Sequence, residues 1–473
     1  LSIAMKRIMR AASIKKLLAP LILAGASTSN FAVELGRIEG FGPVSRGFAG
    51  GGVAHATGAA AIILNPAELL SNKPGHEFMV QVSEIQAAID VRNEQTHEIV
   101  HTANLGNNRG PYDLPEVAYS YRGDDWAFGA GIFAAAGFGI EYGRDSFLST
   151  TTTGNVATGL ESSGRLTALR IPIALAWQAR PTLRLGAALD IVNLGLNVAT
   201  LYDAKQVRML VQQDRASGGL VTIVGALPTL AGVHLDFVND HPIAGGLSGW
   251  GIGGRVGASW QVSPQTSLAL AYEFETQLTD LRGKGRLTAV DILNNHIPVD
   301  GQGRFEDMQL PAAFVVGVSH QASTSVAVIA DLRRTYWRKM LGDARFSYRA
   351  EGGLFDGQEM NALLALGFNN ITSLTLGAQW SPNDRWTFRS GASHAVQQLV
   401  KDNNFSGAFP TLTRNHLVVN ASYLWQSQYE FTFGCTYAWT PPVHNPGNNT
   451  ASIPPIKGRN HQITPVISYR LKF

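Results

Sequence analysis

The chain has 473 residues, of which only 15% are charged, and its formal net charge is +3. Soluble domains usually carry about 25% charged residues, and so small a net charge gives no reason to expect a nucleic-acid partner. The single cysteine, Cys435, excludes an internal disulfide framework.

Residues 1–32 have the pattern of a secretory signal peptide. Basic residues precede a short apolar run at 17–26, and Ala24 and Ala26 fit a small-x-small cleavage site, with a second site near Ala32. A membrane anchor is the alternative, but a run of about ten residues is too short to cross about 30 Å of hydrocarbon. We therefore predict an exported protein, cleaved near residue 26 or 32.

Residues 33–75 differ from the rest of the chain because they show no sustained two-residue alternation. Glycine and alanine dominate positions 47–61, and Asn65, Pro66 and Ala67 follow. Asparagine favours the cap of a helix and proline its first turn. The glycine run lacks the lysine and hydroxyl residue of a phosphate-binding loop. The segment is therefore predicted to be a compact, mostly helical unit.

From residue 76 onward, apolar residues recur at every second position, which is typical of strands with one apolar face. The predicted strands lie near 77–91, 114–122, 126–142, 169–177, 183–191, 250–260, 268–274, 312–318, 326–332, 374–380, 386–392, 417–425, 429–439 and 463–473.

The connections between these strands alternate in length. Short polar turns lie at 123–125, 180–182, 263–266, 321–324, 381–384 and 426–428, whereas the other connections are long: 92–112, 144–163, 200–248, 279–308, 339–369, 395–413 and 440–459. Short turns on one side and long loops on the other are typical of an outer-membrane barrel. Tryptophans beside the short turns also fit an interfacial girdle. A large soluble β-sandwich, the alternative, explains neither feature.

We therefore predict a fourteen-stranded antiparallel transmembrane β-barrel over 76–473, in the outer membrane of a Gram-negative bacterium, with residues 33–75 as a hatch in its lumen. The last strand is expected to pair with the first, so that the barrel has no open edge. Its final residue, Phe473, is similar to the C-terminal signal read by the barrel assembly machinery.

The chain resembles the FadL/TodX family of outer-membrane channels for long-chain fatty acids and aromatic hydrocarbons. The resemblance rests on the small-residue run at 45–54, on the Asn-Pro-Ala motif at 65–67 and on the barrel that ends in phenylalanine. Leu310-Pro311-Ala312, Trp337 and the stretch at 386–391 are also similar to the family.

The resemblance implies a route for passive uptake of a hydrophobic compound, either an aromatic hydrocarbon or a long-chain fatty acid. Cargo would pass from a groove between loops to a pocket above the hatch, and then sideways into membrane lipid through a kink in the third strand. The hatch motif is matched by Asn65, Pro66 and Ala67, the kink by Ala135, Ala136, Gly137, Phe138 and Gly139, and the groove by Val221, Ile223, Val224, Leu227 and Leu230. The loop at 279–308 is the expected second wall of the groove. A monomer without a cofactor is also implied.

The glycines of the third strand have two interpretations. Glycine inside a strand marks a bend or bulge, but it also makes room for a packed hatch. The alternatives for function are an outer-membrane barrel enzyme such as a lipase, for which the Gly-x-Ser-x-Gly motif is missing, and a general diffusion porin, which needs no hatch. The scattered histidines give no metal-binding pattern.

Overall fold

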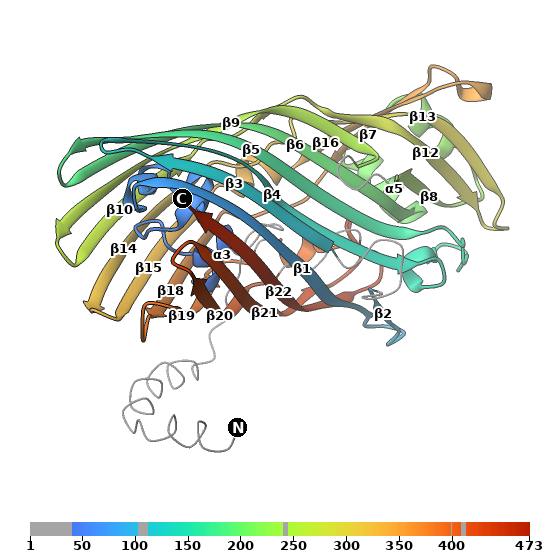
Figure 1. Ribbon diagram of the computed structural model, residues 1–473. Helices are drawn as coiled ribbons and strands as arrows, with labels where there is room; N and C mark the ends of the chain where they lie inside the picture. Colours follow the sequence, from blue (N-terminus) through green and yellow to red (C-terminus); the bar gives the residue numbers. More distant parts are fainter. Residues whose placement is uncertain (1–39, 103–111, 240–244, 399, 408–412) are drawn as a thin grey trace. The chain divides into compact units, whose positions relative to one another are not determined.

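The computed structural model describes residues 40–102, 112–239, 245–398, 400–407 and 413–473 (Figure 1). The predicted signal peptide at 1–32 and the first part of the predicted hatch lie outside these residues.

Antiparallel pairing closes the long strands into a barrel. Around the barrel, the strands follow one another in the order β1 (Gly75–Asn93), β3 (Tyr112–Arg122), β4 (Trp126–Gly143), β5 (Ser162–Arg180), β6 (Leu183–Asp203), β9 (Leu247–Ser263), β10 (Thr266–Glu273), β14 (Ala313–Ser323), β15 (Val326–Thr335), β18 (Ile371–Trp380), β19 (Trp386–Ala395), β20 (Asn415–Trp425), β21 (Tyr429–Asn445) and β22 (Ile456–Lys472). β22 pairs with β1 from Glu77 opposite Lys472 to Asn93 opposite Ile456, so neither strand is left as an edge.

The predicted count of fourteen strands is wrong for this sheet. Within the described residues the sheet contains 22 hydrogen-bonded strands. Those that the sequence pattern missed lie in connections that were interpreted as loops: β2 (Ile99–His101), β7 (Ala216–Ser217), β8 (Leu230–Phe237), β11 (Gln277–Leu278), β12 (Leu281–Asp291), β13 (His296–Glu306), β16 (Ala344–Ala350) and β17 (Glu359–Leu364). They extend the wall at the loop end, where β6, β8, β12, β13, β16 and β17 pair in succession.

The composition of the missed strands explains why they were not predicted. β12 and β13 alternate charged or polar residues with glycine, as in the run Arg282 to Gly285, and the most exposed side chains of that run are charged. A strand without one continuous apolar face lacks the pattern by which sequence reveals strands.

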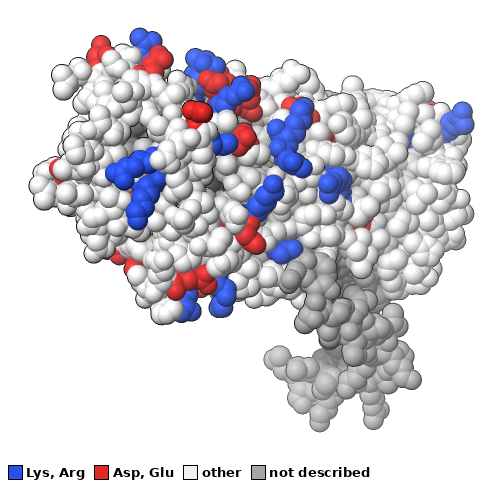
Figure 2. Space-filling view, turned by 180° about the vertical axis from the view of Figure 1, so that it is seen from behind, with Lys and Arg blue, Asp and Glu red and all other residues white. Residues whose placement is uncertain are grey.

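The outer face of the barrel wall is apolar. Along β5, Ile173, Leu175 and Trp177 are 50–60% exposed, whereas Ala174 and Ala176 between them are buried against the interior. Exposed tryptophans also mark the short-turn end: Trp126, Trp177, Trp260, Trp380, Trp386 and Trp425. Figure 2 shows the same division, because charged side chains gather toward the loop end and leave a broad belt almost free of charge. This belt is the surface expected to face lipid.

None of the helices in the described part of the chain is long and apolar enough to cross a membrane.

Short helices fill the lumen near the short-turn end (blue in Figure 1). They are α3 (Gly42–Gly47), η1 (Gly58–Ala60), α4 (Ala61–Leu64) and η2 (Pro66–Ser71). Most residues of this segment are buried, and Ile62, Phe48 and Ala61 have no exposed surface. Residues 40–72 are called the hatch below. The loops carry η3 (Phe147–Ser149), α5 (Ala204–Gln212), α6 (Gly219–Gly225), α7 (Trp337–Leu341), η4 (Gly353–Phe355) and η5 (Asp402–Asn404).

Candidate functional site

Carboxylates of the barrel wall accept hydrogen bonds from the hatch backbone. Glu116 of β3 accepts one from the Gly42 N–H at 2.7 Å and another from the Arg46 guanidinium at 3.0 Å. On β1, Glu77 accepts one from the Ala59 N–H at 2.7 Å. Glu116 and Arg46 are almost completely buried, and a buried charge is tolerated only when it is paired and hydrogen-bonded.

A third wall carboxylate holds the glycine-rich turn of the hatch. One oxygen of Asp331, on β15, accepts hydrogen bonds from the N–H groups of Gly52 at 2.7 Å and Val53 at 2.9 Å. The hatch is therefore attached to β1, β3 and β15, on separate parts of the wall.

The Asn65 side chain organises the end of the hatch. Its Oδ1 accepts a hydrogen bond from the Ala67 N–H at 3.2 Å and so caps η2, while its Nδ2 donates to the Val53 carbonyl at 2.8 Å. Asparagine at this position thus links the two halves of the hatch, which alanine could not do.

Two wall glycines admit the Asn-Pro-Ala motif. A Cβ added to Gly186 on β6 would lie 2.4 Å from the Ala67 nitrogen, and one added to Gly257 on β9 would lie 1.8 Å from Asn65 Oδ1. The motif therefore packs directly on the backbone of the wall, and the glycines are needed for that close approach.

The ladder between β3 and β4 is interrupted partway along the wall. Its last pair is Glu116 with Phe133, although both strands continue beyond it. Pro115 comes next on β3 and has no N–H to donate. On β4, the register against β5 shifts between Ala134 and Ala136, which leaves Ala135 as an extra residue. A bulge of this kind bends a strand and ends pairing locally.

A small inner cavity lies between the hatch and this part of the wall. Its volume is about 40 Å³. Both the hatch and the wall contribute apolar side chains to it. Its lining is Phe41, Ile63, Ala135, Ala136, Arg170, Glu273, Leu310, Pro311, Arg333, Thr335 and Trp337.

The arginines around the inner cavity are tied to carboxylates. Arg170 contacts Glu273 and lies 3.0 Å from Asp190, and Arg333 lies 2.8 Å from Glu273. Arg255 shares Asp190 at 2.5 Å. Interlocked pairs of this kind neutralise the charge that a buried cluster would otherwise carry.

An apolar groove lies between the loops at the other end of the barrel. Its volume is about 60 Å³, and its lining is Tyr202, Val207, Leu210, Ala216, Leu220, Val221, Val224, Val233, Leu235, Leu287, Phe346, Met360, Ala362 and Leu364. Apart from the Tyr202 hydroxyl, these side chains offer only apolar atoms. Contact with such a surface favours an apolar compound by about 0.8 kcal/mol per buried CH₂ group.

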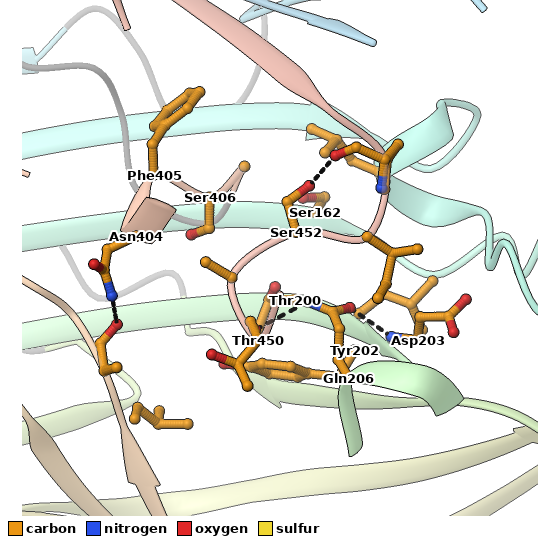
Figure 3. A pocket seen from close by; sticks show the side chains of 18 of the residues that line it. Ser162, Thr200, Tyr202, Asp203, Gln206, Asn404, Phe405, Ser406, Thr450 and Ser452 are labelled. Atoms are coloured by element: carbon orange, nitrogen blue, oxygen red, sulfur yellow. Dashed lines mark hydrogen bonds between the residues drawn. The ribbon is translucent and has the colours of Figure 1, made fainter. Parts of the chain in front are cut away.

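A larger cavity, called the chamber below, has a volume of about 110 Å³ and a mixed lining (Figure 3). Loop segments near 147–152, 200–210, 364–368, 404–407 and 450–454 surround it. Its apolar side includes Phe147, Phe368 and Phe405, whereas hydroxyl, amide and carboxylate side chains from Thr200, Asp203, Gln206 and Asn404 lie elsewhere in its lining.

Asp203 is the charged residue among the side chains that line the chamber. It caps α5 through the Lys205 N–H at 2.8 Å and accepts hydrogen bonds from the backbone and hydroxyl of Thr153 and from the Thr152 hydroxyl. Burial raises the pKa of this carboxyl, whereas the hydrogen bonds lower it. The combined effect of the hydrogen bonds is larger, so the pKa of Asp203 lies below its usual value.

Comparison with known proteins places the chain in a family. The family described as outer membrane protein transport protein (OMPP1/FadL/TodX) matches residues 22–468. The chain belongs to this family. It is a protein of the outer membrane.

Two solved toluene transporters are similar to this FadL/TodX-family chain over nearly their whole length. TodX of Pseudomonas putida is 28% identical with a TM-score of 0.81, and 92% of this chain and 99% of TodX are covered. TbuX of Ralstonia pickettii is 33% identical with a TM-score of 0.76, with the same coverage of 92% and 99%. A long-chain fatty acid transport protein of Salmonella typhi is 24% identical over 274 residues, which are 53% of this chain. The chain spans 60% of the length of that curated relative.

The predicted groove residues of this family member differ in whether they line the groove, pack beside it or are exposed. Val221 and Val224 lie on α6 and line the groove, and Leu227 packs beside the same cluster. Leu230 is buried at the start of β8, and Ile223 points away with 38% of its surface exposed.

The predicted partner loop at 279–308 contributes Leu287 to the groove. Phe346, Met360, Ala362 and Leu364, from the next long connection, were not anticipated. They alternate along β16 and β17, and this short alternation is the one sequence signal that could have revealed them.

The predicted kink residues lie on β4 around the register shift. Ala135 and Ala136 reach the inner cavity, while Gly137, Phe138 and Gly139 pair with β5 beyond the shift. Phe473 is 60% exposed, and its ring stacks on that of His76 at 5.1 Å. Recognition of Phe473 by the assembly machinery stays a prediction.

Sequence reasoning pointed to Arg170, Asp190 and Arg255 as charges of the lumen, but it missed Glu273 beside them and the carboxylates that hold the hatch. Glu116, Glu273 and Asp331 lie in predicted strands but were not singled out. On β15 the signal was present, because Asp331 follows the buried Ala327 and Ile329 on the inward face. An inward carboxylate among apolar residues requires a partner, which for Asp331 is the hatch. Among the described residues, no group of three or more His, Cys, Asp or Glu side chains could hold a metal ion.

Proposed function

We propose that this protein is a channel, rather than an enzyme, that takes up small hydrophobic compounds passively across the outer membrane. The observation that carries the proposal is the position of the inner cavity. It lies between the hatch and Ala135 and Ala136 of β4, at the point where the β3–β4 ladder is interrupted. Family membership and the two similar toluene transporters support the same function.

The groove is the proposed first site for cargo. Its apolar lining faces the loop end, where a compound arrives from water. Capture there needs no energy source, because transfer of apolar surface out of water is itself favourable. The groove residues Val221 and Val224 would contact the cargo, and Leu227 packs beside them.

The proposed exit is lateral, through the wall beside Ala135. A hydrophobic compound that left through the short-turn end would return to water, whereas one that leaves between β3 and β4 enters lipid directly. The hatch supports this route, since wall carboxylates hold it across the lumen and Asn65 links its two halves. We propose that the hatch stays in place during transport.

Uptake of labelled toluene and labelled oleate at low concentration tests the proposal. The host would lack its own hydrophobic channel and express either the natural sequence or a variant in which Ala135 is deleted, so that β4 loses its extra residue. The channel with the natural sequence should accelerate uptake of one compound, and the deletion should abolish most of that gain. The compound that is accelerated identifies the cargo class.

A matched deletion of Ala179 serves as the control. It also removes one residue at a register shift, on β5 between Gln178 and Arg180, but close to a short turn. Uptake that survives both deletions in correctly folded barrels would refute the lateral exit. Uptake that is never faster than in the empty host would refute the channel itself.

A further inference from the structure

The chamber lies between the groove and the inner cavity. Tyr202, Leu210 and Leu364 line both the chamber and the groove, so they form the wall between them. On the other side, Phe368 lines the chamber and Trp337 lines the inner cavity, and their rings meet edge to face at 6.4 Å. A compound that moves from the groove to the inner cavity therefore has the chamber in its path.

The size of the chamber matches a single ring. Its volume of about 110 Å³ is of the same order as an engineered apolar cavity of about 150 Å³ that binds benzene. The groove and the inner cavity, at about 60 and 40 Å³, are smaller. An extended acyl chain would exceed the chamber, whereas one substituted ring would nearly fill it.

The charges of the chamber disfavour an anion. Among the described residues, the side chains that line it include one carboxylate, Asp203, and no lysine, arginine or histidine. The described lining of the groove likewise contains no charged residue. A carboxylate-bearing compound would therefore lose hydration without gaining a cation, and it would be repelled by Asp203.

The chamber also contains hydroxyl groups that are available to a ligand. The side-chain hydroxyls of Thr200, Tyr202 and Ser406 line it and make no hydrogen bond within the described part of the chain. Burial raises the pKa of Tyr202 to about 12, so its hydroxyl remains a donor at neutral pH. In Figure 3, Thr200 and Tyr202 lie on one strand near Thr450 and Gln206, whereas Phe405 and Ser406 come from the opposite loop.

We propose that the chamber is an intermediate binding site on the route, and that it selects neutral single-ring compounds that carry a hydroxyl group over aromatic carboxylates. The ring lies against the phenylalanine side of the chamber, and its hydroxyl hydrogen-bonds to the Thr200 hydroxyl. This assignment rests on the proposed function and adds to it a cargo class and a site.

Binding to the full chain in lipid nanodiscs tests the assignment. The probes are 4-fluorotoluene, 4-fluorobenzyl alcohol and 4-fluorobenzoate, which share a ring and differ in one substituent. Fluorine NMR at pH 7 reports their binding, and empty nanodiscs correct for partition into lipid. We expect the alcohol to bind most tightly, the toluene less tightly, and the benzoate not at all.

Two variants locate the site. Thr200→Val removes a hydroxyl without changing the shape of the side chain, and it should weaken binding of the alcohol about fivefold while leaving the toluene unchanged. The matched control is Thr182→Val in an exposed short turn, which should change neither. Ala451→Phe fills the chamber and should abolish binding of both ring compounds.

Each contrary result overturns the assignment. Equal effects of Thr200→Val on alcohol and toluene mean that the hydroxyl is not recognised, and benzoate binding as tight as the alcohol means that charge is not excluded. Binding that survives Ala451→Phe lies elsewhere. These results are independent of the proposed function, which fails separately if cells that express the channel take up no compound faster.

Discussion

Glu116 and Asp300 each pair with an arginine, but the surroundings of the two pairs are opposite. The Glu116–Arg46 pair, at 3.0 Å, joins the wall to the hatch with almost no surface exposed to solvent. The Asp300–Arg286 pair, at 2.7 Å, joins β12 to β13 in the loop region with more than half of each side chain exposed. The two pairs represent two regions, because buried polar groups hold the hatch, whereas the loop region leaves this charged pair exposed and lines the groove with apolar side chains.

This contrast shows where rigidity and adaptability lie. A hatch held by buried charges and by backbone contact has few alternative arrangements, because each one leaves a polar group without a partner. A groove made of apolar side chains can rearrange at little cost, because apolar contacts have no fixed direction. The first region suits a plug and the second suits capture of variable cargo.

The largest effect is expected from Glu116→Gln. The change removes the Glu116 charge from the buried pair with Arg46, and loss of one partner of a buried ion pair typically costs about 3–5 kcal/mol. We expect the hatch to become sensitive to protease and to urea below the concentration that unfolds the barrel. The paired control is Asp300→Asn, which should cost at most about 1 kcal/mol because the pair is exposed. Equal effects of the two changes would contradict the comparison.

A smaller effect is expected from Gly186→Ala. The new Cβ would lie 2.4 Å from the Ala67 nitrogen, a backbone atom that cannot rotate away. Overpacking of this kind typically costs about 1–3 kcal/mol, and we expect the hatch to loosen and the barrel to leak small polar solutes in liposome-swelling assays. Gly225→Ala on α6 meets no atom within 4 Å and should leave the leak unchanged. If the Gly186→Ala barrel leaks no more than the natural protein, the position of the Asn-Pro-Ala motif does not depend on this contact.

Capture by the groove should respond to the loss of a few apolar carbon atoms from its lining. Val224→Ala removes apolar surface from the groove lining, and we expect a threefold to tenfold loss of uptake at low toluene concentration, on the order of 1 kcal/mol. Ile223→Ala is the matched control, since Ile223 lies on the same helix but outside the lining. If Ile223→Ala has the larger effect, α6 presents to cargo the face that carries Ile223 rather than the face that carries Val224.

The mildest effect concerns Asp203 and pH. Its hydrogen bonds lower the pKa of the folded form below the ordinary carboxyl value. The resulting stabilisation is therefore fully present above the ordinary pKa of about 3.9 and is lost as the pH falls through the lower, folded value. We expect the protection factors for hydrogen exchange, which are corrected for the intrinsic effect of pH on exchange, to fall in acid near residues 152–153 and in α5. Those of the barrel strands should stay unchanged.

Asp203→Asn is the control for this pH dependence. The variant keeps a capping side chain but removes the ionisation, so the protection factors of α5 should no longer change between pH 3 and pH 6, a range that spans the ordinary carboxyl pKa of about 3.9. A pH dependence that persists in the variant would assign the titration to another group.

The amino-acid sequence was sufficient to predict an exported β-barrel and its family. The alternating apolar residues from 126 to 142 and from 463 to 473, together with the unequal connections, depend only on neighbours in the chain. The small residues at 45–61 and the Asn-Pro-Ala motif similarly indicated a packed hatch. These are local patterns, and such patterns survive in a sequence without knowledge of the fold.

The tertiary structure decided the strand count, the second wall of the groove and the partners of the hatch. Asp331 meets Gly52 and Val53 across nearly 280 positions of the chain, and β17 approaches β7 only after the loops fold against each other. No local pattern records such a pairing, because the energy of a buried carboxylate depends on which donors the fold brings to it. The sequence alone therefore indicated the long strands of the wall, and folding determined the additional strands and the contacts that hold the hatch.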